Sequence, residues 1–384
     1  MGMTNTPIEA INVEPRLLCG PGPANISPDV LAALSKPLLG HLDPDMYEIL
    51  TDLAAMTARV YQRDEGDGMT LPISATGTSG MEAGIAALVE PGSTVIIGVN
   101  GYFGRRLVEI ANRYHANVVE VEADWGQAVT NEALLEALAA NPDARLMAVV
   151  YAETSSGVRH DLPELGEAMR DNDTFLMADC VTALGGIEVA LTDWGVDYAY
   201  SCSQKCLAMS PGMSPISISQ RALEFMRSQP KPSTFYLDPQ LLEAYWLARP
   251  AAYHHTLPSP LVFGLHEALR EVLNEGLEAR WARHAEAGGY LQAAMAERNM
   301  ELLADPAHQL PQLTAVLVPE GIDGAGVQKQ MLREHGIEIG GGLPGAPAMW
   351  RFGLMGYNAN VATADKVLAA FDAVMADAPT LAAA

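Results

Sequence analysis

Cysteine is scarce in this sequence of 384 residues: Cys19, Cys180, Cys202 and Cys206 are the four, and none follows Cys206. They form no CxxC pair and no disulfide framework, a pattern that suits a reducing compartment. Cys202 and Cys206 show CxxxC spacing, but two thiols without a second pair of ligands make a poor zinc site. We therefore expect small core residues at these positions and no metal centre.

Long apolar runs are absent as well. No uninterrupted run approaches the length of a membrane span. Residues 1–18 lack the basic and apolar regions of a signal peptide, and the final residues carry no peroxisomal tripeptide. These absences predict a soluble, cytoplasmic protein with no membrane partner.

Positive charge is the third scarce feature. The chain has 23 Lys and Arg residues against 47 Asp and Glu residues, and its net charge is −24. Such a charge argues against nucleic acid and anionic membranes as partners, and its simplest role is solubility. Because a negative field does not attract anions, an anionic ligand needs a locally positive pocket.

Short apolar runs alternate with helical patterns through the first two thirds of the chain. Strands are expected at residues 93–99, 117–123, 145–151, 174–179 and 197–203, with helices such as 103–115 and 131–141 between them. This alternation predicts an α/β domain with a mostly parallel sheet that is covered on both faces. Ligand sites in such sheets form at the carboxyl ends of the strands, so polar residues there are the first candidates.

The pattern changes after a helix expected over residues 264–281. A strand is expected at 313–319, and a final helix follows. In that helix one apolar face is formed by Val367, Leu368, Phe371, Val374 and Met375. We therefore predict a large domain over residues 1–275, including an N-terminal arm, and a smaller C-terminal domain over residues 276–384.

Polar residues follow several of the expected strands. Thr76, Gly77 and Thr78 precede an apolar helix, whose free N–H groups can bind an anion, although any capped helix looks similar. Asp179 ends a strongly apolar strand, where an unpaired charge costs several kcal/mol, so it either binds a partner or caps the following loop. Thr154 follows another strand.

Lys205 is the only charged residue of "YAYSCSQKCLAMSPG", residues 198–212. Lysine is rarely buried unless it is paired, and a buried lysine with a lowered pKa is a nucleophile toward carbonyl groups. An amine, a carboxylate for a pyridinium nitrogen and a helix N-terminus for a phosphate are together what pyridoxal 5′-phosphate (PLP) requires.

Four motifs identify a family. The segments "SCSQKCL", "TFYLD" (234–238), "YHHTLP" (253–258) and "IEIGGGLPGAPAMWRFGLMGYNA" (337–359) resemble those of class V aminotransferases of PLP fold type I. The resemblance is closest to the alanine–glyoxylate (serine–pyruvate) aminotransferases, and it extends from residues 17–31 to the last helix. It implies a seven-stranded, mostly parallel sheet between helices and a smaller C-terminal α+β domain.

The resemblance implies roles for residues around the cofactor ring. Lys205 matches the lysine that forms the Schiff base, and Asp179 the partner of the pyridine nitrogen. Val181 matches a residue that packs on one ring face, and Thr154 a hydroxyl near the ring oxygen. Phe103 stands at the ring-stacking position, which is usually Trp in the animal enzymes, and stacking survives this change.

Further matched residues bind the phosphate and the substrate. Gly77, Thr78 and Gln204 match the phosphate ligands, and Thr76 at the same helix start is also expected to bind the cofactor. Tyr253 and Thr256 match groups that reach the phosphate from the second subunit of a homodimer. Arg351 matches the arginine whose bidentate fork grips the substrate carboxylate.

The sequence departs from the family at three more positions. Thr78 stands where the animal enzymes can have His, Thr154 where they have Ser, and Cys202 where they have Gly. No function follows from Cys202. His254 and His255 are adjacent, so on an extended segment they are expected to point to opposite sides, which suits structural or interface roles.

The resemblance implies a ping-pong transamination in which alanine or serine donates its amino group to glyoxylate or pyruvate. Lys205 is the expected general base, and Asp179 keeps the cofactor ring an electron sink. The alternatives are another donor, such as aspartate or pyridoxamine, and a PLP lyase or desulfurase, which needs a late cysteine that this chain lacks. A nicotinamide-dependent dehydrogenase is disfavoured because no GxGxxG motif follows the first expected strand. A non-catalytic relative would be expected to lose Lys205 or Asp179, and both are present.

Overall fold

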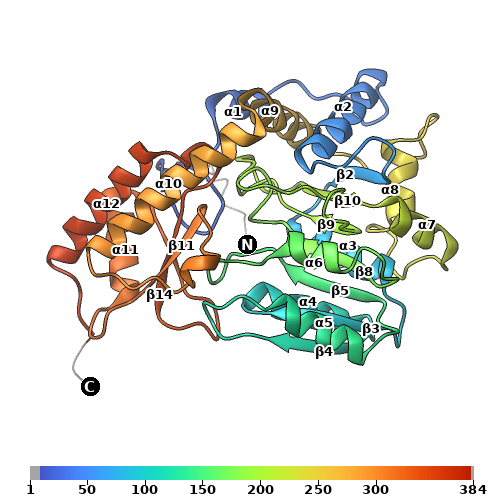
Figure 1. The fold of residues 1–384 in the computed structure, drawn as a ribbon. Helices are drawn as coiled ribbons and strands as arrows, with labels where there is room; N and C mark the ends of the chain where they lie inside the picture. Colours follow the sequence, from blue (N-terminus) through green and yellow to red (C-terminus); the bar gives the residue numbers. More distant parts are fainter. Residues whose placement is uncertain (1–8, 382–384) are drawn as a thin grey trace, which may run out of the picture.

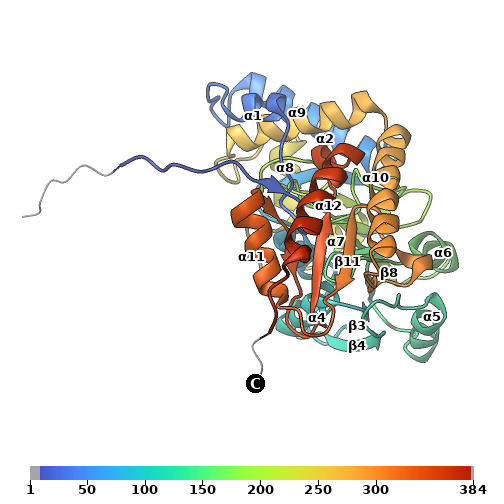
Figure 2. The same cartoon turned by 90° about the vertical axis from the view of Figure 1, so that its left-hand side faces the viewer.

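The computed structural model describes residues 9–381. The expectations on a signal peptide and on a peroxisomal tripeptide concern residues that lie wholly or partly outside this range. Residues 9–16 leave the body of the protein as an extended, exposed segment (Figure 2). Among the helices described, none has the length and apolar character needed to cross a bilayer.

A seven-stranded sheet forms the centre of the protein (Figure 1). Its strands, in spatial order, are β2 (Met69–Ile73), β10 (Ser214–Ile218), β9 (Tyr198–Tyr200), β8 (Phe175–Asp179), β5 (Leu146–Val150), β3 (Thr94–Val99) and β4 (Asn117–Glu122). β10 runs antiparallel to both of its neighbours, and all other neighbours are parallel. The predicted α/β fold with a mostly parallel sheet is confirmed.

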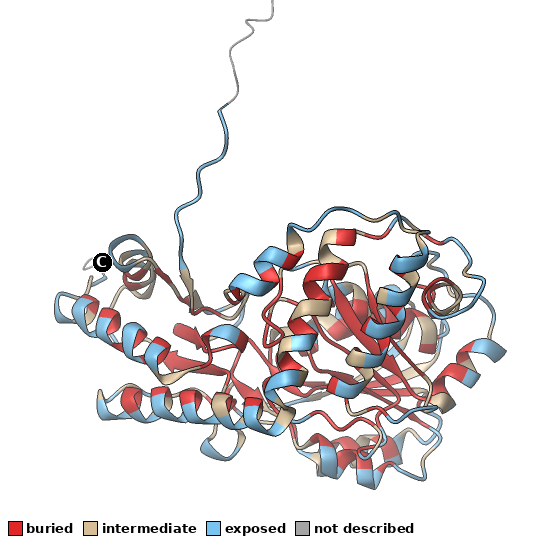
Figure 3. Ribbon diagram, turned by 90° about the horizontal axis from the view of Figure 1, so that it is seen from above, coloured by how far each residue is buried: buried red, intermediate tan, exposed pale blue. Residues whose placement is uncertain are grey.

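Helices cover this sheet. They are α1 (Pro28–Leu34), α2 (Pro44–Val60), α3 (Gly77–Leu88), α4 (Tyr102–Arg113), α5 (Asn131–Ala140), α6 (Leu162–Ala168), α7 (Gln220–Ser228), α8 (Pro239–Trp246) and α9 (Ser259–Glu275). In Figure 3 the strands are buried while the outer faces of the helices are exposed. Every residue of β5 and β8 is buried, as expected for strands of a parallel sheet that are covered on both faces.

Two strands of the sheet, β2 and β10, are absent from the sequence-based expectations. Each contains a proline, and Pro72 of β2 lies directly opposite Pro215 of β10 in the register. Because proline donates no backbone hydrogen bond, a proline within an apolar run argues against a strand. Here the antiparallel pairing tolerates both prolines, which only the tertiary structure reveals.

The C-terminal elements group on one side of the sheet (Figure 1). They are α10 (Leu277–Glu297), β11 (Leu313–Leu317), α11 (Gly324–His335), β12 (Ile337–Glu338), β13 (Gly340–Gly341), β14 (Met349–Gly353) and α12 (Val361–Ala376). β11, β14 and β13 form an antiparallel sheet, and the short β1 (Leu17–Leu18) pairs with β12. The predicted apolar face of the last helix is confirmed, because its Val367, Leu368, Phe371 and Val374 are buried in a second core.

The prediction of a single helix over residues 264–281 is wrong. The structure divides it into α9 and α10 at Gly276, whose φ of 87° lies outside the helical region. The apolar periodicity is continuous across this glycine, so the pattern alone gave no sign of the break. The division into domains at residues 275 and 276 stays a prediction.

Candidate active site

Asp179 is the last residue of β8, at the carboxyl edge of the sheet. Its Oδ2 accepts a 2.6 Å hydrogen bond from the hydroxyl of Tyr200, and its Oδ1 accepts a 2.8 Å bond from the N–H of Val181. Asp179 is 2% exposed, and burial raises the pKa of its carboxyl group to about 7. Tyr200 faces Asp179 because β8 and β9 pair in that register, which the sequence does not reveal.

Lys205 lies in the loop that follows β9, and it is buried. Burial lowers the pKa of its amine, which favours the neutral, nucleophilic form. The amine donates a hydrogen bond to the carbonyl oxygen of Pro21 in the N-terminal segment. A Cβ atom on Gly22 would lie 2.5 Å from Lys205 Cδ, and the φ of Gly22 is 99°, so this close approach requires glycine.

A cavity of about 130 Å³ contains both groups. It is lined by Thr76, Gly77, Thr78, Met81, Phe103, Arg106, Asp179, Val181, Tyr200, Cys202, Gln204 and Lys205. The structure thus brings most of the expected cofactor residues together, from four separate segments of the chain. Met81, Arg106, Tyr200 and Cys202 also line the cavity and are not among the expected cofactor residues.

One end of the cavity suits an anion. α3 begins at Gly77, and the side chain of its N-cap Thr76 makes no capping hydrogen bond. Arg106 donates a 3.1 Å hydrogen bond to Thr78 Oγ1 and lies 4.9 Å from the centre of the Phe103 ring. A helix N-terminus and a guanidinium together form the locally positive pocket that an anionic cofactor requires. Arg106 follows Phe103 by three residues on one helical face, a spacing that could have indicated it.

Gln204 offers a test of whether the cavity fits PLP. Its side-chain oxygen is buried and has no hydrogen-bond partner among residues 9–381. Buried polar atoms are nearly always paired, so this orphaned amide fits a cavity that receives a further polar group. With the amine, the carboxylate and the anion site, the residues present fit the cofactor.

Cys202 packs against the start of α3. A Cβ atom on Gly77 would lie 3.1 Å from Val181 Cγ2 and 3.2 Å from Cys202 Cβ, so a larger residue at position 77 would require these neighbours to move by a few tenths of an ångström. Burial raises the pKa of the Cys202 thiol to about 11, which disfavours the reactive thiolate. Its position in the structure is that of a small packing residue.

Arg351 and Thr154 contact each other beside the cavity, although neither lines it. Arg351, on β14, is 5% exposed and donates from Nε to Gly341 O at 2.7 Å and from Nη1 to Thr154 O at 3.1 Å. Burial lowers its pKa to about 10, so it is charged at neutral pH. The hydroxyl of Thr154 forms a hydrogen bond with that of Thr182.

Tyr253 and Thr256 are not among the residues that line the cavity. Tyr253 is 61% exposed, and its hydroxyl lies 3.4 Å from Thr256 Oγ1. The roles expected for them, like those of the other site residues, stay predictions.

The expectation that His254 and His255 point to opposite sides is wrong. Their Nδ1 atoms lie 2.7 Å apart, which places the two rings face to edge. His254 Nε2 lies 3.1 Å from Phe235 O, and His255 Nε2 lies 3.0 Å from Ser74 Oγ. The segment is not a regular strand, so the alternation of an extended chain does not apply to it.

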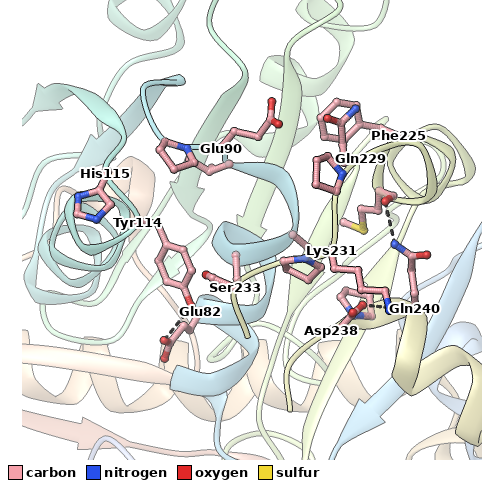
Figure 4. A pocket seen from close by; sticks show the side chains of 18 of the residues that line it. Glu82, Glu90, Tyr114, His115, Phe225, Gln229, Lys231, Ser233, Asp238 and Gln240 are labelled. Carbon is pink, nitrogen blue, oxygen red and sulfur yellow. Dashed lines mark hydrogen bonds between the residues drawn. The ribbon is translucent and has the colours of Figure 1, made fainter. Parts of the chain in front are cut away.

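A larger pocket of about 650 Å³ lies elsewhere, between the ends of α3 and α4 and the segment that contains Lys231 and Gln240 (Figure 4). Tyr114 donates a hydrogen bond to Glu82 there. None of the expected site residues lines this pocket. The chemistry therefore points to the smaller cavity.

Known proteins with similar sequences and structures give the family. The model of the family "Aminotransferase class-V" matches residues 71–362. Alanine–glyoxylate aminotransferase of Drosophila melanogaster is 38% identical over 362 residues, which cover 93% of this chain and 91% of that protein. (S)-ureidoglycine–glyoxylate transaminase of Bacillus subtilis is 34% identical over 380 residues, covering 94% and 90%. The solved structure of alanine–glyoxylate aminotransferase from Nostoc sp. has a TM-score of 0.93 and 42% identity, covering 98% of this chain and 100% of that one. The chain therefore belongs to the class V aminotransferases of PLP fold type I, and it depends on pyridoxal 5′-phosphate.

Proposed function

We propose that this aminotransferase transfers the amino group of a small L-amino acid, alanine or serine, to glyoxylate or pyruvate. The observation that carries the proposal is the buried Lys205 amine in one cavity with Asp179, beside the buried Arg351. Similar proteins named for alanine and glyoxylate support this choice of substrates.

The residues that would hold PLP are those of the cavity. Thr76, Gly77, Thr78 and Gln204 would bind its phosphate, with Arg106 adding positive charge. Asp179 would pair with the ring nitrogen, and Phe103 and Val181 would contact the ring faces. When bound, PLP supplies an electron-withdrawing ring that stabilises negative charge at the substrate α-carbon.

Lys205 would serve both as the amine that holds the cofactor and as the general base. Burial lowers the pKa of Nζ, which favours the neutral form that can accept the α-proton of the substrate and return a proton later. Asp179 would keep the ring nitrogen protonated, and hydrogen bonds from Tyr200 and from the N–H of Val181 fix the direction of its carboxylate. Arg351 orients the substrate carboxylate, because the carbonyls of Gly341 and Thr154 hold its planar fork in place.

The acceptor has broader support than the donor. Two of the similar proteins differ in the donor that their names print, alanine in one and (S)-ureidoglycine in the other, but both names include glyoxylate. Glyoxylate is therefore the first acceptor to test, and ureidoglycine joins aspartate and pyridoxamine among the alternative donors.

We further propose that the enzyme is a homodimer whose subunits share their active sites. Exposed apolar side chains belong to the segments around Tyr253. Phe235, whose ring stacks on that of His254, the residue adjacent to Tyr253, is 68% exposed. The ring of His41 lies 5.3 Å from that of Tyr253, and Leu38, three residues before His41, is 71% exposed. Exposed apolar patches of this kind mark association surfaces. If the protein sediments as a monomer that still binds PLP tightly, the role given to Tyr253 and Thr256 is wrong.

The substrate proposal is tested with the purified, PLP-loaded protein. Each candidate donor is added alone, and loss of the visible absorbance of the bound cofactor is followed together with formation of the matching 2-oxo acid. Glyoxylate is then added, and glycine is measured. Alanine or serine should convert the cofactor and yield glycine, whereas conversion by aspartate, pyridoxamine or ureidoglycine alone contradicts the proposed donor.

The role of Lys205 is tested separately by Lys205→Ala. Borohydride reduction of the wild-type protein with PLP should add a pyridoxyl group to Lys205, which peptide mass spectrometry locates. The variant should show no covalent adduct and no transamination. An adduct on another lysine would move the chemistry away from this cavity.

A further inference from the structure

Helix α4 begins without a capping side chain of its own. Its N-cap is Gly101, so the first backbone N–H groups need acceptors from elsewhere. Ser155 Oγ accepts from Tyr102 N at 2.9 Å, and Glu153 Oε2 accepts from Phe103 N at 3.1 Å and from Gly104 N at 3.3 Å. The cap of α4 thus comes from β6 (Ala152–Glu153) and the residues after it, about 50 positions later in the chain.

Glu153 is fully buried, with 0% of its surface exposed. Its second oxygen, Oε1, accepts from Ser155 N at 2.9 Å and from Ser155 Oγ at 2.6 Å. Glu153 forms no ion pair with a Lys or Arg residue in the described part of the chain. The four donors and the positive end of α4 are therefore what compensate this carboxylate for its lost hydration.

Gly101 shows how closely Glu153 approaches the helix. A Cβ atom on Gly101 would lie 2.4 Å from Ser155 Oγ and 2.6 Å from Glu153 Cδ. A capping Ser, Thr or Asp at this position would therefore displace the carboxylate. The buried position of Glu153 at the start of α4 therefore depends on glycine at position 101.

This arrangement connects two sides of the active site. Phe103, whose N–H donates to Glu153, is one of the residues that line the cavity. Thr154, between Glu153 and Ser155, accepts the hydrogen bond of Arg351 through its carbonyl. The position of the helix start therefore depends on the same short segment that holds Arg351.

We propose that Glu153 is a positioning residue for the cofactor ring, which it places by capping α4 and thereby fixing Phe103. This inference rests on the proposed function, because it assumes that PLP occupies the cavity. Glu153 itself does not line the cavity, so it acts through Phe103.

The test is a double-mutant cycle on PLP affinity, measured by titrating the cofactor-free protein and following its intrinsic fluorescence. Glu153→Gln places an amide N–H₂ group against backbone N–H donors of α4 or against Ser155. It should weaken PLP binding about tenfold, which is the effect on affinity expected from the loss of one aromatic contact. In the Phe103→Leu background the same change should alter the affinity by less than about twofold, since the group through which it acts is gone. Equal losses in both backgrounds would refute the positioning role.

A second readout separates ring placement from general damage. Inorganic phosphate is titrated as a competitor of PLP. Its affinity should fall by clearly less than that of PLP in Glu153→Gln, because Thr76, Gly77 and Thr78 at the start of α3 are untouched and only Arg106 lies on α4. The circular dichroism of the bound cofactor in the visible range should change in amplitude. A parallel loss of phosphate affinity would instead indicate a structural role and overturn the inference.

The matched control is Asp197→Asn. Asp197 is also buried and accepts bonds from Leu176 N and Ser219 Oγ, but it precedes β9, at the opposite edge of the sheet from Asp179. This variant should lose stability without changing PLP affinity. If Glu153→Gln does not fold, Ser155→Ala replaces it in the same cycle, because it removes the acceptor of Tyr102 N and a donor to Glu153. Absence of PLP binding by the wild-type protein would overturn the proposed function itself, whereas normal binding by the variants would overturn only the role of Glu153.

Discussion

Asp179→Asn should stabilise the cofactor-free protein at alkaline pH although it removes the proposed partner of the cofactor nitrogen. Burial raises the pKa of Asp179 from its ordinary value of 3.8 to about 7, so the ionised carboxylate destabilises the fold. Because the folded-state pKa lies above the unfolded one, the stability that protonated Asp179 contributes is fully present below pH 3.8. It is lost progressively as the pH rises from 3.8 through 7.

The expected magnitude follows from this shift. Three pKa units correspond to about 4 kcal/mol when Asp179 is fully ionised, and to about 1.5 kcal/mol at pH 5, where only the unfolded state is ionised. Asparagine keeps an oxygen for the N–H of Val181, but it forces the hydroxyl of Tyr200 to accept rather than donate, which costs about 1 kcal/mol. The stability of the variant relative to the wild type should therefore rise by about 2–3 kcal/mol between pH 5 and pH 8.

The assay is urea unfolding of both cofactor-free proteins at pH 5 and pH 8 and at one protein concentration, because association affects apparent stability. Histidine ionisation contributes equally to both proteins and cancels in the difference. Asp197→Asn is the control, since Arg221 holds Asp197 at 2.5 Å and the variant should lose stability at both pH values. A difference between Asp179→Asn and the wild type that does not change with pH would refute the argument that Asp179 carries a poorly compensated buried charge.

Three further predictions concern other parts of the structure. Gly101→Ala should reduce the free energy of unfolding by about 1–3 kcal/mol, because the added Cβ would collide with Glu153. Its melting temperature should therefore fall, and PLP binding should weaken in titration. An unchanged melting temperature and affinity would contradict the close approach of Glu153 to Gly101. Arg351→Lys should raise KM for the amino acid about tenfold or more while PLP affinity stays constant, since lysine offers no bidentate fork; an unchanged KM in steady-state kinetics would remove Arg351 from the substrate site. Burial lowers the pKa of His160 to about 4 and that of His284 to about 3, from the ordinary value of 6.5. The stability that these two neutral histidines contribute is therefore fully present above pH 6.5, and it is lost as the pH falls from 6.5 toward these values. Urea midpoints should fall from pH 7 to pH 5, and His284→Gln, which keeps a polar side chain, should show a smaller fall; equal falls would contradict the buried neutral state.

Much of the fold could be predicted because its signals are local. The apolar runs of β3, β5 and β8 are flanked by helical patterns, and each strand was placed to within one or two residues. The strands with Pro72 and Pro215 were missed, since a local rule counts proline against a strand, whereas the pairing of β2 with β10 accommodates both. The break at Gly276 was missed for a similar reason: its backbone conformation leaves no mark on the apolar periodicity.

The sequence by itself determined the family and the chemical groups of the site: an isolated lysine after an apolar strand, an aspartate at a strand end, and motifs in family order. Such signals lie within single segments, which is why they can be found without coordinates. Only the tertiary structure decided which groups surround them. Tyr200 meets Asp179 through strand register, Pro21 meets Lys205 through the path of the N-terminal segment, and Glu153 caps a helix that begins 51 residues earlier. These contacts join residues far apart in the chain, so neither partner could be identified from its own neighbours in the sequence. The pKa shifts of Asp179 and Lys205 likewise depend on burial, which only the folded chain produces.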